Sequence, residues 1–209
     1  MAKQSRSIPV MKAVIDEVIS RLWSGDESLI RIPEICDATG VNYGSVYHHF
    51  GSREGVIDAA YNELFSELVQ HDIDELSHAS EESADFDEFL LRVQPLIGML
   101  SAGEDRRRSR AMRARIVAAA LTRPELGELI GATESRLTAE LRDVMVMGQD
   151  RGFVRKDVSA WSLAVMVQAI VFGRVLDDVT SSPIEQEDWD FTMVTLFQSA
   201  ILSGDAQDL

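Results

Sequence analysis

Apolar residues recur every three or four positions along almost the whole 209-residue chain. Residues at this spacing line one face of an α-helix, so each run predicts an amphipathic helix. Strict two-residue alternation, which is typical of a half-buried strand, does not extend beyond four residues anywhere. The pattern predicts an all-α protein of about nine helices, at residues 8–24, 32–39, 43–50, 53–78, 84–102, 105–121, 124–151, 158–179 and 185–203.

Composition narrows the class of protein further. Hydrophobic residues make up 45% of the chain, which is typical of a globular domain with a sizeable core. Cys36 is the one cysteine, which excludes a disulfide framework and a multi-cysteine zinc site. The apolar run from Leu163 to Phe172 is interrupted by Gln168 and is too short to span a membrane. We therefore expect a cytoplasmic protein with no membrane partner, no cofactor and no metal.

The formal net charge of −15 argues against nucleic acid as a partner, because phosphates repel an acidic surface. The charge is unevenly distributed, however. Residues 1–60 carry six Lys and Arg against eight Asp and Glu, which leaves −13 of the charge on residues 61–209. The net charge of the chain therefore argues only weakly against DNA binding by the N-terminal part. A net charge of −2 on residues 1–60 is nevertheless not the basic surface of a typical DNA-binding domain.

Residues 32–55, IPEICDATGVNYGSVYHHFGSREG, predict two short helices joined by a tight turn. Gly40 supplies the left-handed backbone that such a turn needs, and Asn42 is a good N-cap for the second helix. That helix places Val46 and Phe50 inward and a short polar and aromatic face outward. This is a helix-turn-helix arrangement, whose second helix fits the major groove of DNA.

The same segment resembles the DNA-binding signature of the TetR family of transcriptional regulators. The resemblance covers about 50 residues with the first helix included, and its ending Tyr-x-His-Phe is distinctive. The matching residues are Ile35-Cys36, Ala38-Thr39-Gly40-Val41, Gly44, Val46-Tyr47-His48-His49-Phe50 and Ser52-Arg53-Glu54. Two departures affect recognition: Arg31 stands where a capping Thr is usual, and Tyr43 where Lys, Pro or Arg is usual.

The resemblance implies roles for individual residues in binding a double-stranded DNA operator. Tyr47 and Ser45 are expected to contact phosphates, and Gly44 to allow close approach of the DNA backbone. Contacts with bases or with neighbouring phosphates are expected from Asn42, Tyr43 and His48. Arg31 and Arg53 are expected to contact further phosphates, the latter beside a helix N-terminus capped by Ser52.

The resemblance also implies a division of the chain and a non-enzymatic regulator, in this case a repressor. Residues 1–55 would form the DNA-binding domain, with helix 53–78 as connection, and residues 56–209 a ligand-binding and dimerisation domain. Helices 158–179 and 185–203 are apolar over wide faces, which favours a homodimer interface. A small, hydrophobic effector would occupy the bundle, with walls expected from Phe86, Phe89, Met99, Met112, Ile116, Met145, Trp161 and Met166.

Two further patterns lie in the acidic part of the chain. Arginines at 106, 107, 108, 110, 113 and 115 spread around one helix, which predicts surface ion pairs. An anionic ligand contact and a second nucleic-acid patch remain as alternatives for this cluster. The spacing Glu75-x-x-His78, with His71 one turn earlier, is that of a metal-binding helix face, but a di-iron bundle needs it twice and the chain has one copy. We expect a solvated surface there.

Two other classes of protein remain as alternatives to the regulator. One is an all-helical enzyme or metal-binding bundle, which predicts paired acid and base groups or a second Glu-x-x-His. The other is a protein-interaction module that uses a degenerate helix-turn-helix and does not bind DNA.

Overall fold

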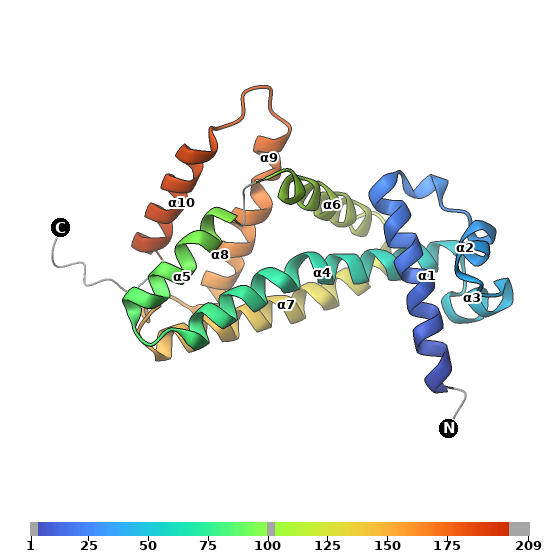
Figure 1. The fold of residues 1–209 in the computed structure, drawn as a ribbon, viewed down its shortest axis with the longest axis horizontal. Helices are drawn as coiled ribbons and strands as arrows, with labels where there is room; N and C mark the ends of the chain where they lie inside the picture. The colour runs from blue at the N-terminus through green and yellow to red at the C-terminus, as the bar shows by residue number, and fades with distance from the viewer. Residues whose placement is uncertain (1–3, 100–102, 201–209) are drawn as a thin grey trace. The chain divides into compact units, whose positions relative to one another are not determined.

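The computed structural model describes residues 4–99 and 103–200, which form α-helices and one short 3-10 helix (Figure 1). The N-terminal elements are α1 (Gln4–Ser24), η1 (Glu27–Leu29), α2 (Ile32–Thr39), α3 (Tyr43–Phe50) and α4 (Arg53–Glu82). They are followed by α5 (Phe86–Met99), α6 (Glu104–Ala120), α7 (Pro124–Asp150), α8 (Ala160–Gly173), α9 (Val175–Asp178) and α10 (Gln186–Ala200). The predicted all-α class is confirmed.

Several predicted helix boundaries differ from the structure. The helix expected over 158–179 is divided into α8 and α9 around Arg174, whose guanidinium lies 4.5 Å from the ring centroid of Trp189. The helix expected over 53–78 continues to Glu82 in α4, and the helix expected over 8–24 begins at Gln4 in α1.

The chain divides into two compact units that do not follow a single boundary in the sequence. Unit 1 contains residues 1–67 and 116–131, and unit 2 contains residues 68–115 and 132–209. Helices α4, α6 and α7 each contribute residues to both units. These units are defined by compactness, whereas the boundary predicted near residue 55 separates two functions. That boundary therefore stays a prediction.

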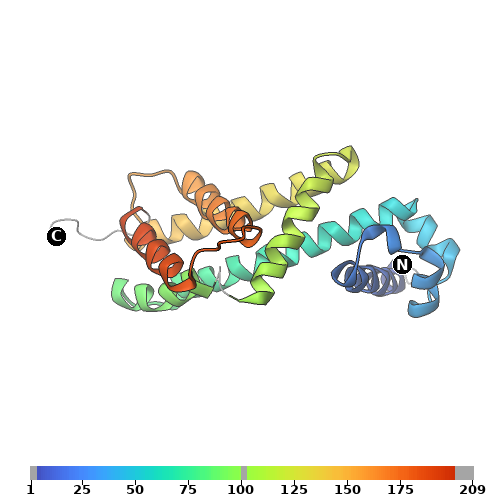
Figure 2. The same cartoon turned by 90° about the horizontal axis from the view of Figure 1, so that it is seen from above.

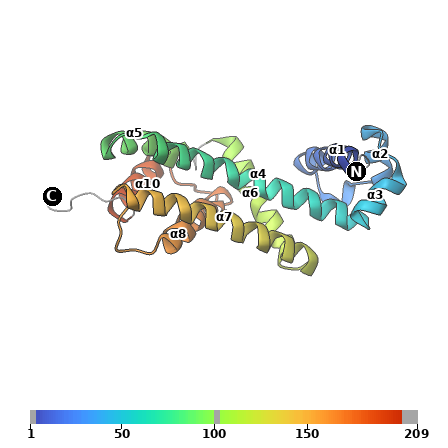
Figure 3. The ribbon, with the colours of Figure 1, turned by 90° about the horizontal axis from the view of Figure 1, so that it is seen from below.

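In unit 1, α1, α2 and α3 pack against one another (Figure 3). The apolar stripe predicted for the first helix is buried, with Val14 and Val18 fully inaccessible. Ile35 of α2 and Val46 of α3 are also completely buried. This shared core fixes the angle between α2 and α3, and it leaves the opposite side of α3 at the surface.

The turn between α2 and α3 depends on Gly40, whose φ of +70° lies in the left-handed region. A Cβ at this position would meet no atom within 4 Å, so only the backbone conformation penalises a larger residue. We expect Gly40→Ala to lower the free energy of unfolding by about 1–2 kcal/mol, measured by urea denaturation. The control is Gly131→Ala inside α7, where an added Cβ would also meet no atom within 4 Å, and it should raise stability by about 1 kcal/mol.

In unit 2, α4 and α7 are linked by the side chains of Gln70 and Glu140, whose Nε2 and Oε2 atoms are 2.9 Å apart. Helix α5 packs against α10 (Figure 2). The rings of Phe89 and Phe153 stack with centroids 4.8 Å apart. Arg151 donates to the backbone carbonyls of Ser80 and Ser83, where its charge complements the negative end of the α4 dipole.

The segment Ala160–Asp178, which comprises α8 and α9, is long and apolar enough to cross a membrane by length and composition alone. Only 22% of this segment is buried within the chain. It also contains the buried Arg174 and the carboxylates of Asp177 and Asp178. An apolar helix with charged groups at one end is equally typical of a helix that packs against a partner helix.

Candidate nucleic-acid interface and ligand cavity

Helix α3 is held at both ends by the contacts that its sequence predicts. The Oδ1 atom of Asn42 accepts a hydrogen bond of 2.8 Å from the backbone N–H of Ser45, which confirms the N-cap. The N–H of Gly51 donates to the carbonyl of Tyr47 over 2.9 Å at the other end. The short helix is therefore rigidly placed, and a rigid helix can hold its exposed side chains in one register.

The outer face of α3 brings together the residues expected to contact DNA. Tyr43 is 51% exposed, Gly44 and His48 are exposed, and Ser45 and Tyr47 are half-buried. The rings of Tyr43 and Tyr47 lie 4.5 Å apart, and a hydrogen bond to Tyr43 raises the pKa of Tyr47. The Tyr47 hydroxyl therefore stays protonated at neutral pH and can donate to a phosphate oxygen.

The predicted residues at the two flanking helix starts behave differently from one another. Arg31 is exposed at the N-cap of α2 and makes no side-chain capping bond, as expected from the loss of the usual Thr. Ser52 accepts a hydrogen bond of 2.9 Å from the N–H of Gly55 at the start of α4.

Phe50, predicted to point inward, is only half-buried. Its ring lies edge-on to the ring of the exposed His49, with the centroids 4.6 Å apart.

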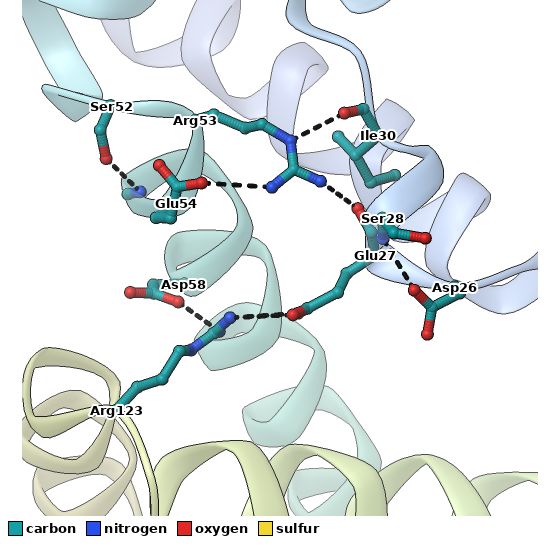
Figure 4. A network of polar contacts seen from close by, with 10 residues as sticks. Asp26, Glu27, Ser28, Ile30, Ser52, Arg53, Glu54, Asp58 and Arg123 are labelled. Atoms are coloured by element: carbon teal, nitrogen blue, oxygen red, sulfur yellow. Dashed lines mark hydrogen bonds and ion pairs between the residues drawn. The ribbon is translucent and has the colours of Figure 1, made fainter.

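Arg53 has a different environment from the one predicted (Figure 4). Its Nε donates to the carbonyl of Ile30 over 2.9 Å, its Nη2 donates to the carbonyl of Glu27, and its Nη1 lies 3.2 Å from Glu54. The guanidinium therefore links α4 to the segment between α1 and α2. Spacing did not predict this structural role, and the phosphate contact of Arg53 stays a prediction.

Arg123 is another arginine of unit 1 with several polar contacts, and it lies in the turn between α6 and α7 (Figure 4). Its Nη1 is 3.1 Å from a carboxylate oxygen of Glu27, and its Nη2 donates to the carboxylate of Asp58. Asp58 is 5% exposed, and burial raises its pKa while the charge of Arg123 opposes that rise. No sequence pattern predicted this cluster, because its members are far apart in the chain.

We expect Arg123→Met to destabilise unit 1 by about 2–4 kcal/mol, because it leaves the Asp58 carboxylate buried without its cation. The loss should be largest at neutral pH. Asp58 already has a pKa above that of the unfolded chain, so its ionisation destabilises the folded state as pH rises through that range. Urea denaturation at neutral and at mildly acidic pH measures both effects.

The control is the double variant Arg123→Met/Asp58→Asn, in which the uncompensated charge is also removed. It should recover a large part of the lost stability at neutral pH. Equal instability of the single and double variants would contradict the role assigned to this ion pair.

Unit 2 encloses a cavity of about 350 Å³, which is within the range of small-molecule sites. Its walls come from α4, α5, α6, α7, α8 and α10 together with Val154. Most of the lining is aliphatic or aromatic, and includes Val69, Ile73, Leu76, Phe89, Val93, Leu96, Leu141, Val144, Met145, Val154, Val167, Val171 and Phe197. The cavity can therefore hold a largely apolar molecule.

Two of the eight predicted wall residues, Phe89 and Met145, line this cavity. The others have different surroundings. Met112 and Ile116 are buried away from the lining, Ile116 in unit 1, and Trp161 is 45% exposed on α8. Phe86 and Met166 are half-buried outside the lining, and the side chain of Met99 lies outside the described residues.

Polar side chains that the sequence did not single out as cavity walls also line it. Arg106 and Arg113 come from α6, Gln168 from α8, and His71, Asp72, Glu75 and Ser80 from α4. The arginine cluster is therefore not a set of surface ion pairs alone. Arg106, Arg110 and Arg113 share one side of α6; Arg110 and Arg113 are buried, and Arg110 forms a two-pronged pair with Asp178 at 2.7 Å.

A capped helix-turn-helix with an exposed face on its second helix, followed by a helical domain with a cavity, is an arrangement typical of DNA-binding proteins. Residues 30–60 match the family model of bacterial regulatory proteins of the tetR family. This match covers α2, α3 and the start of α4, so the helix-turn-helix is that of a TetR-family DNA-binding domain. No match was found among the curated proteins.

Solved structures share this fold over nearly the whole chain at low sequence identity. A TetR-family regulator from Mesorhizobium loti has 16% identity and a TM-score of 0.70, with 95% of this chain and 99% of that one covered. One from Rhodococcus sp. has 17% identity and a TM-score of 0.65, with 92% and 98% covered. A transcriptional regulator from Saccharomonospora viridis, in complex with choline, has 16% identity and a TM-score of 0.61, with 98% and 100% covered.

Proposed function

We propose that the chain is a homodimeric repressor that binds a palindromic operator through α3 and leaves it when a small molecule occupies the cavity of unit 2. The observation that carries the proposal is the face of α3. Tyr43, Gly44 and His48 are exposed there on a helix that is capped at both ends. The paired rings of Tyr43 and Tyr47 gather aromatic surface on this face, and such clusters mark interaction sites.

The dimer is supported by apolar surface on the C-terminal helices. Trp161, Val165 and Ala169 are exposed at four-residue spacing on α8, and Phe191 of α10 is 74% exposed. Contiguous apolar surface of this kind is typical of an interface between subunits. A dimer would also place two recognition helices about one DNA turn apart, as a palindrome requires.

The effector is supported by the size and lining of the cavity and, by analogy, by the choline bound to the regulator from S. viridis. Ligand binding would favour a conformation whose recognition helices are wrongly spaced for the operator. Because the protein acts on chromosomal DNA, we place it in the cytoplasm. As a regulator it needs no catalytic group and no cofactor.

The test is a gel shift at low salt with DNA from upstream of the protein's own gene and with other genomic fragments. We expect a shifted complex that Tyr47→Ala weakens by about tenfold or more, since a phosphate contact and a ring pair are lost. A protein-interaction module or an enzyme would give no shift with any fragment. Unchanged binding by the Tyr47 variant would likewise contradict the proposal.

A further inference from the structure

Gln168 is a polar side chain in the cavity of unit 2 whose hydrogen bonds are incomplete. The Oε1 atom of Gln168 accepts from the hydroxyl of Thr138 over 3.2 Å. Its Nε2 group is buried and has no hydrogen-bond partner among residues 4–99 and 103–200. A buried donor without an acceptor is costly, and such a group is often retained because a ligand completes it. Gln168 therefore offers an N–H donor to whatever fills the cavity.

A buried positive charge lines the same cavity. Arg113 is 7% exposed, and its guanidinium lies 5.6 Å from the ring centroid of Phe172. Burial lowers the pKa of Arg113, and the carboxylates of Glu134 and Asp72 oppose that effect. An arginine remains protonated even with a lowered pKa, so the cavity contains a cation in a poorly solvated place.

The two carboxylates near Arg113 also interact with other side chains. Asp72 is paired with Arg106, whose Nη1 lies 2.5 Å from its Oδ1. The Thr138 hydroxyl lies 3.4 Å from Oε1 of Glu134 and shares its single hydrogen between that carboxylate and Gln168, and Glu134 does not line the cavity. The other titratable lining groups, His71 and Glu75, are exposed to solvent. The cavity therefore combines apolar walls with donors from Gln168 and Arg113, and the lining carboxylate of Asp72 is engaged by Arg106.

We propose that this cavity binds an apolar molecule with a single carboxylate, which accepts a hydrogen bond from Nε2 of Gln168 and is attracted by Arg113. The inference rests on the proposed function in one respect, which is that the molecule bound in the cavity would be the effector of the regulator. A quaternary ammonium ligand, like the choline of the S. viridis regulator, would leave the Gln168 donor unsatisfied and would be repelled by Arg113. The rest of the ligand would replace water against residues such as Val93, Leu141 and Phe197.

The test compares three probes with the same alkyl chain: decanoate, decanol and decyltrimethylammonium. Calorimetry on the full-length protein without DNA should show that decanoate binds about tenfold more tightly than decanol, because its hydrogen bond is charge-assisted. The ammonium compound should bind most weakly. Equal or tighter binding of decanol or of the ammonium compound would overturn the proposal, as would the absence of decanoate binding.

The variant Gln168→Leu separates the polar contact from the apolar one. It should weaken decanoate about tenfold while leaving decanol nearly unchanged, and thermal unfolding should show equal or greater stability because a buried unpaired donor is removed. Arg108→Gln is the control, since Arg108 is exposed on α6 and does not line the cavity. Wild-type affinity of Gln168→Leu for decanoate would overturn the proposal.

These measurements separate this inference from the proposed function, because none of them uses DNA. A protein that binds decanoate through Gln168 but shifts no DNA would refute the regulator and support the cavity's specificity. A protein that shifts DNA but does not prefer decanoate would support the regulator and refute the specificity proposed for the cavity.

Discussion

Replacement of Gly44 by leucine is expected to reduce DNA affinity by about a hundredfold or more while the protein stays folded. Gly44 is exposed in the first turn of α3, where a Cβ would meet nothing closer than Oδ1 of Asn42 at 3.5 Å, an ordinary contact. The helix should gain about 0.5–1 kcal/mol from the loss of glycine. If α3 enters the major groove, the added side chain occupies the space that the DNA backbone needs.

Fluorescence anisotropy with an operator duplex measures the affinity, and thermal unfolding measures the stability. The control is Gly131→Leu, which places the same side chain in an open position on α7. It should gain similar stability and retain full DNA binding. Strong binding by the Gly44 variant would show that α3 is not the surface that meets DNA.

Replacement of Val165 by glutamate should convert the dimer to a monomer and, in consequence, weaken operator binding by about a hundredfold or more. Val165 is 46% exposed on α8, in the apolar row with Trp161 and Ala169. Its substitution should therefore leave the fold of each chain intact. In an interface, however, the new carboxylates would be buried without partners, which is strongly unfavourable.

Sedimentation velocity and light scattering report the oligomeric state. Leu91→Glu is the matched control, because Leu91 is 72% exposed on α5 and lies outside the proposed interface. It should remain dimeric with unchanged DNA affinity. A dimeric Val165 variant, or a Leu91 variant that dissociates, would place the interface elsewhere.

The helix-turn-helix could be predicted because its determinants are local. The left-handed Gly40, the Asn42 cap and the buried Val46 lie within seven residues of one another, and each acts on its own helix end or face. Local hydrogen bonds and helical periodicity carry that information in the sequence itself. The same holds for the boundaries of α2 and α3, which are at the residues predicted.

The cavity and the arginine cluster depend on tertiary contacts that no local pattern specifies. Gln168 appears in the sequence only as an interruption of an apolar run, yet in the structure it presents an unpaired donor to the cavity. Arg123 pairs with Asp58 and Glu27 across 65 and 96 residues of sequence. Periodicity predicts which side of a helix is buried, but not which other helix it meets.

Selection of binding sequences from a pool of randomised duplexes, carried out at low salt, determines whether the protein recognises a palindromic operator. We expect enrichment of an inverted repeat whose half-site centres are about 34 Å apart, bound by one dimer. We also expect binding to weaken only gradually as salt rises, because residues 1–60 carry few cations that can neutralise phosphates. Failure to enrich any sequence, or enrichment of a single half-site bound by a monomer, would contradict the proposed function.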